Sequence, residues 1–421
     1  MVPVDSFSQD FWGKPFVDLF PRGDCAERDQ RRTPGSDGKR DRLRGKAWGR
    51  VLLDRVDFRG WARNKAFIAC MFNTFLRREQ YGAIKLVLYS FVGSALALVG
   101  IMAAFVVSGA ESFALEHLIA FPYDEGFQRW AFPVTFLGFV ILAGLWPFHT
   151  WAPTGHVAAP TGTSMLLAGV VMKLGAYGAL RIPLTLFPMG AAMWREELAL
   201  LAAVGIVAGA LVALVQQDFK FIIGYSSVSH MGFVTLGIYA WNERALQGAV
   251  MTMLAHGLSA AALFMLAGGL QHRIHTRNMP DMGGFWPKVP KMTAVAIFFS
   301  VAALGMPGLG NFIGEFLALI GAFQANVTLT VVAAFGLILA SVYSLWVLQK
   351  VFQGEYSNRS FDDSHLTDLS RREMLYFAAM MIGLVWMGLY PQTFLSMSEP
   401  VLTQMLSDST QTLATSIEGG L

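Results

Sequence analysis

Two charged side chains stand alone in long apolar stretches of the sequence. Lys173 is the only charged residue in the stretch 130–180, and Glu315 is the only one in 292–349. An ammonium at the centre of a bilayer costs roughly 2.5–3.5 kcal/mol on insertion scales. A buried lysine or glutamate can exchange its proton when its partners move. We interpret both residues as candidates for proton handling inside a membrane; the alternative is a structural ion pair.

Histidines in the same apolar part of the chain could work with these charges. His230 follows the hydroxyl-rich run Tyr225–Ser229, His256 lies in another apolar segment, and His149 lies beside a proline. Because imidazole titrates near neutral pH, a row of histidines can relay protons. Each one taken alone is equally a structural histidine with satisfied hydrogen bonds. His156, further along, is interpreted as a loop residue.

Other polar residues point to no further chemistry. Lys220, beside Asp218, is interpreted as an anchor near the cytoplasmic face. His272 and His275 lack the spacing of a His-Glu-x-x-His zinc site, so no metal site is expected. The glycine-rich run 308–314 follows no strand and lies in an apolar segment, so a dinucleotide loop is rejected. We expect no cofactor in this chain.

The composition indicates an all-α polytopic membrane protein. Of the 421 residues, 54% are hydrophobic and only 14% are charged, whereas soluble domains carry about 25% charged residues. The apolar runs do not alternate with polar residues, which excludes a membrane β-barrel. The two cysteines, Cys25 and Cys70, provide neither a disulfide framework nor a zinc or iron–sulfur ligand set.

About nine membrane-spanning helices are expected, because nine apolar segments approach the ~20 residues that a bilayer needs. They cover residues 82–107, 131–150, 161–184, 196–216, 219–241, 246–270, 291–323, 327–352 and 373–394. If the side before Gly82 is cytoplasmic, most loop arginines and lysines fall on the cytoplasmic side, as the positive-inside rule requires. This orientation places the C-terminal tail outside.

Two of these segments are interrupted. Trp146–Pro153 breaks one helix, and Leu304–Asn311 breaks another just before Glu315. Proline removes a backbone donor and glycine loosens the turn, so such breaks occur where they are packed in protein or line a hydrated cavity. Paired broken helices are typical of transport sites. An ordinary proline kink is the alternative for either break alone.

Several motifs in this order resemble one family. They are Trp146–Pro160 (WPFHTWAPTGHVAAP), Lys173–Gly178 (KLGAYG), Asp218–Gly232 (DFKFIIGYSSVSHMG), Ala255–Ser259 (AHGLS), His275–Gly284 (HTRNMPDMGG) and Gly310–Phe316 (GNFIGEF). Together they are similar to the antiporter-like chain M (chain 4) subunits of proton-pumping NADH:quinone oxidoreductase, complex I. The similarity covers residues 77–395. The wider family includes multisubunit cation/proton antiporters and membrane-bound hydrogenase subunits.

The resemblance implies a fourteen-helix antiporter-like fold with inverted repeats and broken helices, of which this chain holds about nine. It also implies a proton pathway through Lys173, His230, His256, Glu315 and His149. In this pathway Lys173 matches the family's central lysine, and Glu315 matches the glutamate of the late broken helix. His230 and His256 match the histidines between them, and His149 matches a histidine near the first break.

The implied protein is a multi-pass subunit of the bacterial inner (plasma) membrane that conducts protons, coupled to electron transfer in other subunits. Its partners are other membrane-arm subunits, including neighbouring antiporter-like subunits, and the lipid bilayer, with no nucleic acid. NADH, FMN, iron–sulfur clusters and quinone are expected in partner subunits. The alternative is a subunit of a multisubunit sodium/proton antiporter or a membrane-bound hydrogenase.

Two departures from the family pattern stand out. The family has a lysine seven positions before His149, where this chain has Leu142. The family also has a glutamate one helix before the span that starts at Gly82, and residues 51–76 show no matching helix. We therefore expect three parts: a polar N-terminal region 1–76, truncated or out of frame; an antiporter-like domain 77–395; and a C-terminal tail 396–421.

Overall fold

The computed structural model describes residues 58–354 and 366–418 of the chain. Contacts divide the chain into two units, Met1–Arg77 and Arg78–Leu421. The second unit contains every helix after α2 and the later part of α2 itself. Most of the N-terminal region expected at 1–76 lies outside the described residues.

The described part of the chain is helical and contains no strand, apart from one isolated bridge between Asp218 and Asn278. The elements are α2 (Phe58–Ser108), α3 (Leu115–Ile119), α4 (Glu125–Ala143), α5 (Trp151–Ala158), α6 (Thr161–Leu166), π-helix η3 (Leu167–Val171), α7 (Met172–Arg181), α8 (Pro183–Leu186), α9 (Pro188–Met193), α10 (Arg195–Leu214), α11 (Phe219–Ala240), α12 (Glu243–Ile274), 3₁₀-helix η4 (Met279–Asp281), α13 (Pro290–Ala303), α14 (Gly310–Ala325), α15 (Val327–Val351), α16 (Arg371–Leu389) and α17 (Gln392–Glu418).

Eight helices among the described residues are long and apolar enough to cross a membrane. The ninth expected span, 291–323, is instead built from the shorter helices α13 and α14, because the chain is interrupted between Ala303 and Gly310. The predicted all-α architecture with broken helices is therefore confirmed.

Side-chain caps explain where several of these helices begin. Asp124, Asp218, Asn242, Asn326 and Ser370 stand at the N-termini of α4, α11, α12, α15 and α16, and each accepts a backbone N–H of the first turn. These residue types are favoured there because their oxygens satisfy donors that have no partner within the helix. The caps at α11 and α12 fix the starts of the helices that carry His230 and His256.

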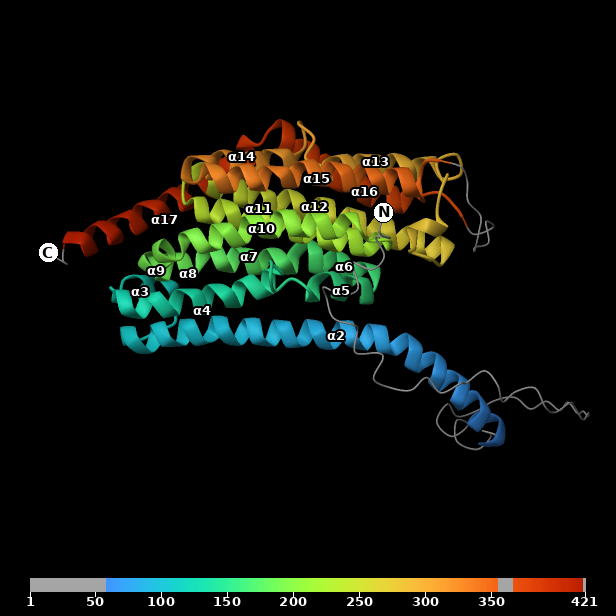
Figure 1. Ribbon diagram of the computed structural model, residues 1–421, viewed down its shortest axis with the longest axis horizontal. Helices are drawn as coiled ribbons and strands as arrows, with labels where there is room; N and C mark the ends of the chain where they lie inside the picture. Colours follow the sequence, from blue (N-terminus) through green and yellow to red (C-terminus); the bar gives the residue numbers. More distant parts are fainter. Residues whose placement is uncertain (1–57, 355–365, 419–421) are drawn as a thin grey trace, which may run out of the picture. The chain divides into compact units, whose positions relative to one another are not determined.

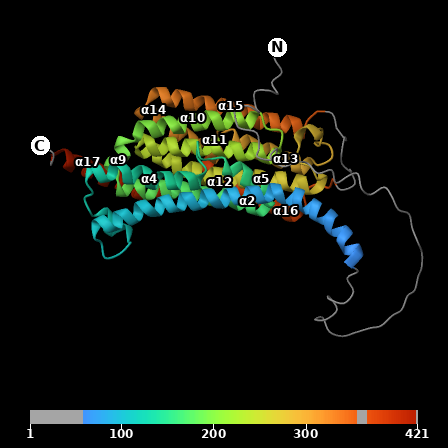
Figure 2. The same ribbon diagram turned by 60° about the horizontal axis from the view of Figure 1, so that its bottom comes forward.

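Helices α10, α11 and α12 run side by side through the middle of the second unit (Figure 1). Helix α11 is the most buried of the candidate spans: 89% of its most apolar 18-residue stretch lies inside the protein. On one side α12 and α11 contact α14, and α10 contacts α15. Figure 2 shows the same bundle turned, with α2 following α4 and α5. His230 of α11 and His256 of α12 are therefore buried inside the bundle.

Close backbone approach joins α2 to α4. A Cβ at Gly138 would lie 2.6 Å from the Gly93 carbonyl oxygen, and a Cβ at Gly93 would lie 2.9 Å from that of Gly138. No larger residue fits at either position, which is how small residues bring membrane helices together. The Tyr89 hydroxyl also lies 3.0 Å from the Thr150 hydroxyl, which ties α2 to the first break.

Both predicted breaks are present. Helix α4 ends at Ala143, followed by Gly144 in the left-handed region, and α5 starts at Trp151. Between α13 and α14, Gly305 and Gly308 have φ values of +81° and +95°. Glycine has no Cβ, so it adopts this backbone conformation without the strain that other residues incur. A third irregularity, the π-helix Leu167–Val171 just before Lys173, was not expected.

Both ends of the membrane region are helical. Helix α2 begins at Phe58, and a family match for the segment before Gly82 stays a prediction. The expected tail, 396–421, is helical as far as Glu418, as part of α17, which contacts α9 and α12. Apolar residues at helical spacing, such as the buried Leu402 and Met405, explain why this segment packs on the bundle.

Candidate functional site

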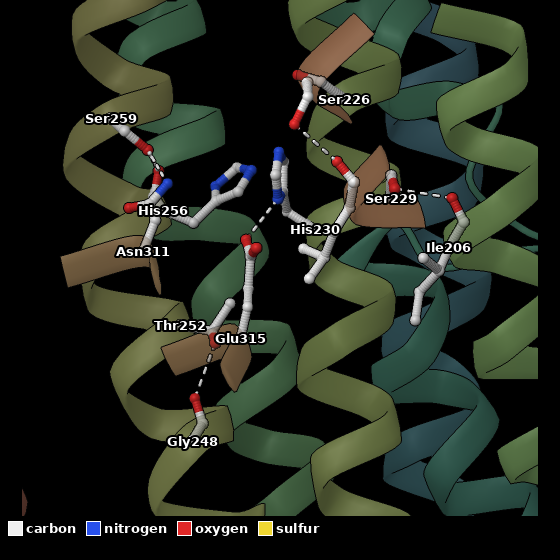
Figure 3. A network of polar contacts seen from close by, with 12 residues as sticks. Ile206, Ser226, Ser229, His230, Gly248, Thr252, His256, Ser259, Asn311 and Glu315 are labelled. Atoms are coloured by element: carbon white, nitrogen blue, oxygen red, sulfur yellow. Dashed lines mark hydrogen bonds and ion pairs between the residues drawn. The ribbon is translucent and has the colours of Figure 1, made fainter. Parts of the chain in front are cut away.

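Four ionisable side chains from four helices come together inside the bundle, three of them visible in Figure 3. Lys173 extends from α7, His230 from α11, His256 from α12 and Glu315 from α14. Their exposed fractions are 8%, 1%, 2% and 1% in that order. The structure thus brings together four of the five residues that the sequence singled out.

Lys173 and His256 form the first pair. The Lys173 Nζ lies 3.0 Å from His256 Nδ1 and donates to the Ala168 carbonyl oxygen at 2.6 Å. An ammonium has only donors, so His256 Nδ1 accepts from a charged Lys173. Ala168 belongs to the π-helix, and such irregular turns are frequent at functional sites. The irregular turn therefore supplies a carbonyl partner for the buried ammonium.

His230 and Glu315 form the second pair. His230 Nδ1 lies 2.6 Å from Glu315 Oε1, a length typical of a charge-assisted hydrogen bond. Glu315 Oε2 is buried and has no hydrogen-bond partner in the part of the chain that the structure describes. It faces Gly305 in the break, where an added Cβ would lie 3.4 Å away. The second pair therefore has one carboxylate oxygen, Glu315 Oε2, that can still accept a hydrogen bond on the side of the α13–α14 break.

The two pairs meet through their imidazole rings. The ring centroids of His230 and His256 are 5.0 Å apart, with the planes tilted by 60°. Around them, Asn311 Nδ2 donates to the Ser259 hydroxyl at 3.0 Å (Figure 3). A water molecule between rings at this separation could hydrogen-bond to both of them. The arrangement is chemically able to pass a proton from Lys173 to Glu315.

His149 lies apart from this cluster. It sits in the break between α4 and α5, buried to 5% exposure, and its Nδ1 has no hydrogen-bond partner among the described residues. Its ring packs against the edge of Tyr225, with centroids 6.1 Å apart. Within the described ranges, no hydrogen bond or ring contact joins His149 to Lys173.

His156 is not the loop residue that we expected. It lies on α5, it is fully buried, and neither ring nitrogen has a partner among the described residues. Its ring packs on Phe264 of α12, at 4.7 Å between centroids. Lys220, expected to be an anchor or ion-pair residue near the cytoplasmic face, lies in the first turn of α11 and is buried, at 2% exposure.

Sequence reasoning also missed Tyr343. This residue lies on α15, is 2% exposed, and places its hydroxyl 3.0 Å from His230 Nε2. Buried tyrosine hydroxyls usually find a hydrogen-bond partner. The only signal in the sequence is a tyrosine inside an apolar span, which does not identify its partner on α11.

The loop between α12 and α13 holds the ends of these elements together. Arg277 pairs with Asp218 at 3.1 Å and donates to the Val157 carbonyl oxygen at 2.8 Å. The loop thereby connects the end of α5 to the start of α11. Leu142, where the family has a lysine, lies on the last turn of α4 and is half-buried. The backbone of α7 at Gly175 packs against the backbone of Leu142, and neither residue carries a charge.

A family model for the transmembrane region of NADH:quinone oxidoreductase and Mrp antiporter proteins matches residues 66–341. The chain belongs to this family. The match includes Lys173, His230, His256 and Glu315, and it ends two residues before Tyr343. Among the described residues, no group of three or more His, Cys, Asp or Glu could hold a metal ion.

Curated relatives and solved structures of the family agree with the fold. NADH-quinone oxidoreductase subunit M of Escherichia coli K12 is 41% identical over 324 residues, which cover 76% of this chain and 64% of the relative. The Rhodobacter capsulatus subunit M is 37% identical over 78% of this chain and 66% of its own length. A chain of respiratory complex I from Thermus thermophilus superposes with a TM-score of 0.74 at 30% identity, covering 78% of this chain and 69% of that chain.

A chain of the Mrp complex from Dietzia sp. DQ12-45-1b shares the fold, with a TM-score of 0.70 at 17% identity over 79% of this chain and 70% of that chain. This chain spans just under two thirds of the length of the subunit M relatives named above. The family, its bacterial relatives and the apolar helices identify a multi-pass protein of the bacterial inner membrane.

Proposed function

We propose that this chain is a membrane-arm subunit of a respiratory NADH:quinone oxidoreductase and conducts protons across the membrane, driven by electron transfer in other subunits. The observation that carries the proposal is the buried series of Lys173, His256, His230 and Glu315, in which hydrogen bonds link each outer charge to a histidine. Intramembrane ionisable groups that face one another in a bundle mark ion and proton pathways.

In the proposed pathway Lys173 gives its proton to His256, because their nitrogens are already 3.0 Å apart. The proton passes between the two rings to His230 and then to Glu315, whose free oxygen faces the second break. His149, in the first break, is proposed as a member of the same proton pathway, near the point where protons enter it. All of these groups exchange protons without a redox cofactor of their own.

We propose that the partners are other membrane-arm subunits, including neighbouring antiporter-like subunits, within the lipid bilayer. NADH, FMN, iron–sulfur clusters and quinone belong to partner subunits in this proposal. The names of the subunit M relatives and of the Thermus complex support it. We assign residues 77–395 to the antiporter-like membrane domain, preceded by a separate N-terminal region.

Replacement of Lys173 by alanine tests the pathway. We expect Lys173→Ala to lower proton translocation per NADH oxidised at least about ten-fold, with assembly of the complex kept, because His256 loses its only charged donor. Lys350→Ala is the matched control, since Lys350 is exposed in the last turn of α15 and lies over Trp346. An unchanged ratio of protons to electrons in Lys173→Ala would contradict the proposal.

A multisubunit sodium/proton antiporter is the second candidate, favoured by the Mrp antiporters in the same family model and by the shared fold. Purification of the complex that contains this chain separates the two. Co-purification of flavin- and iron–sulfur-bearing subunits supports the oxidoreductase. Sodium-dependent proton transport in their absence, without NADH oxidation, supports the antiporter.

A further inference from the structure

His230 has partners at both ring nitrogens. Nδ1 contacts Glu315 Oε1 at 2.6 Å, and Nε2 contacts the Tyr343 hydroxyl at 3.0 Å. Neutral imidazole has one donor nitrogen and one acceptor nitrogen, whereas the protonated ring has two donors. The partner at Nε2 must therefore donate to the neutral ring with its proton on Nδ1, and accept from the protonated ring. A tyrosine hydroxyl can do both.

Ser226 provides the second place for the tyrosine proton. The Ser226 hydroxyl donates to the Ile223 carbonyl oxygen at 2.9 Å, so towards other groups it can only accept. In Figure 3, Ser226 lies beside the His230 ring, on the side away from Glu315. The Tyr343 hydroxyl contacts the same ring at Nε2. We therefore take Ser226 Oγ as the acceptor for the Tyr343 proton when the hydroxyl turns away from Nε2.

These contacts allow two complete hydrogen-bond arrangements. When the His230 ring is neutral and Nε2 carries no proton, Tyr343 donates to Nε2. When a proton arrives at Nε2, the N–H donates to the Tyr343 oxygen, and the hydroxyl turns to donate to Ser226. Neither arrangement leaves a buried donor without an acceptor, a defect that costs about 1–3 kcal/mol for each group. Between the two arrangements an N–H bond forms at Nε2 with the proton that His256 loses, and the Tyr343 hydroxyl rotates.

We propose that Tyr343 and Ser226 are a positioning pair that keeps His230 hydrogen-bonded in both protonation states, and so lets it hold a proton between His256 and Glu315. This inference rests on the proposed proton pathway. It differs from it in assigning a role to α15, which carries no charged residue between Val327 and Gln349.

The contact itself is tested by infrared spectroscopy of the full-length chain in lipid nanodiscs. The ring-stretch band of His230 is identified as the band lost in His230→Gln. We expect Tyr343→Phe to shift this band, because Nε2 loses its hydrogen bond. Tyr239→Phe is the matched control: Tyr239 is also buried, but its hydroxyl has no partner in the described structure, so the band stays in place. An unshifted band in Tyr343→Phe overturns the inference.

The role is tested in the assembled complex. We expect Tyr343→Phe to lower coupled proton transfer about two- to ten-fold, which corresponds to one lost hydrogen bond, and Ser226→Ala to lower it in the same direction. The double variant is expected to be no slower than Tyr343→Phe, because both changes act through one hydroxyl. Additive losses, or a Tyr343→Phe rate equal to that of Tyr239→Phe, overturn the inference.

The two readouts separate this inference from the proposed function. If the unchanged complex transfers no protons during NADH oxidation, the proposed function fails, and this inference fails with it, even where the infrared band shifts. If the unchanged complex pumps and Tyr343→Phe neither shifts the band nor slows transfer, only this inference fails.

Discussion

At the scale of single residues, the site depends on the length and protonation of each side chain. Glu315 reaches His230 from α14, and its second oxygen lies beside Gly305 with no hydrogen-bond partner among the described residues. Lys173 reaches His256 and a carbonyl of the π-helix at the same time. A substitution that keeps shape but removes the exchangeable proton therefore separates packing from proton transfer.

Glu315→Gln is such a substitution. The amide keeps the size of the carboxyl group and can hydrogen-bond His230, but it cannot take up and release a proton at pH 7. We expect proton translocation per NADH to fall at least about ten-fold while the complex assembles normally. Glu243→Gln is the control, because Glu243 is exposed in the first turn of α12. Pumping at the parental level in Glu315→Gln would refute a role for the carboxyl proton.

At the scale of elements, the break between α13 and α14 places backbone without side chains next to the Glu315 carboxyl group. Gly305 and Gly308 both have positive φ, but only Gly305 lies against Glu315 Oε2. A Cβ at Gly308 would meet nothing within 4 Å. The two glycines share a backbone requirement and differ in what surrounds them.

This difference gives a matched pair of variants. Gly305→Ala and Gly308→Ala are each expected to destabilise the protein by about 1–3 kcal/mol, because alanine is strained at positive φ. Only Gly305→Ala also places a methyl group about 3.4 Å from Oε2, so only this variant is expected to slow proton transfer. Thermal unfolding and proton transfer are measured for both. Equal slowing in the two variants would show that the space beside Glu315 is unimportant.

At the scale of the whole molecule, the distribution of loop charges and the number of crossings among the described residues predict an orientation. Eight spans and the broken pair α13–α14 give an odd number of crossings between the cytoplasmic start of the α2 span and α17. The positive-inside rule then places α17 on the outer face, and the loop before α13 in the cytoplasm.

Cysteine labelling in intact cells measures this orientation. In a chain whose Cys25 and Cys70 are replaced by serine, a cysteine introduced at the exposed Ser407 of α17 is expected to react with a membrane-impermeant maleimide. A cysteine at the exposed Lys291, in the first turn of α13, is expected to react only after lysis. The reverse pattern would invert the assigned orientation and the direction of the proton pathway.

The sequence by itself determined the membrane class, the positions of the spans to within a few residues, and both helix breaks. Apolar runs must lie in lipid, and proline and glycine interrupt helices whatever surrounds them. It also identified Lys173 and Glu315, because a lone charge in an apolar run is costly wherever it lies. Each of these conclusions depends on residues that are close together in the chain.

Only the tertiary structure decided which groups touch. Lys173 meets His256 across 83 positions, His230 meets Glu315 across 85, and Tyr343 meets His230 across 113. Helical periodicity shows which face a residue occupies, but it does not show which helix covers that face. The burial of His156, the π-helix beside Lys173 and the hydroxyl contact at His230 all arise from packing between distant helices, which is why the sequence left them undetermined.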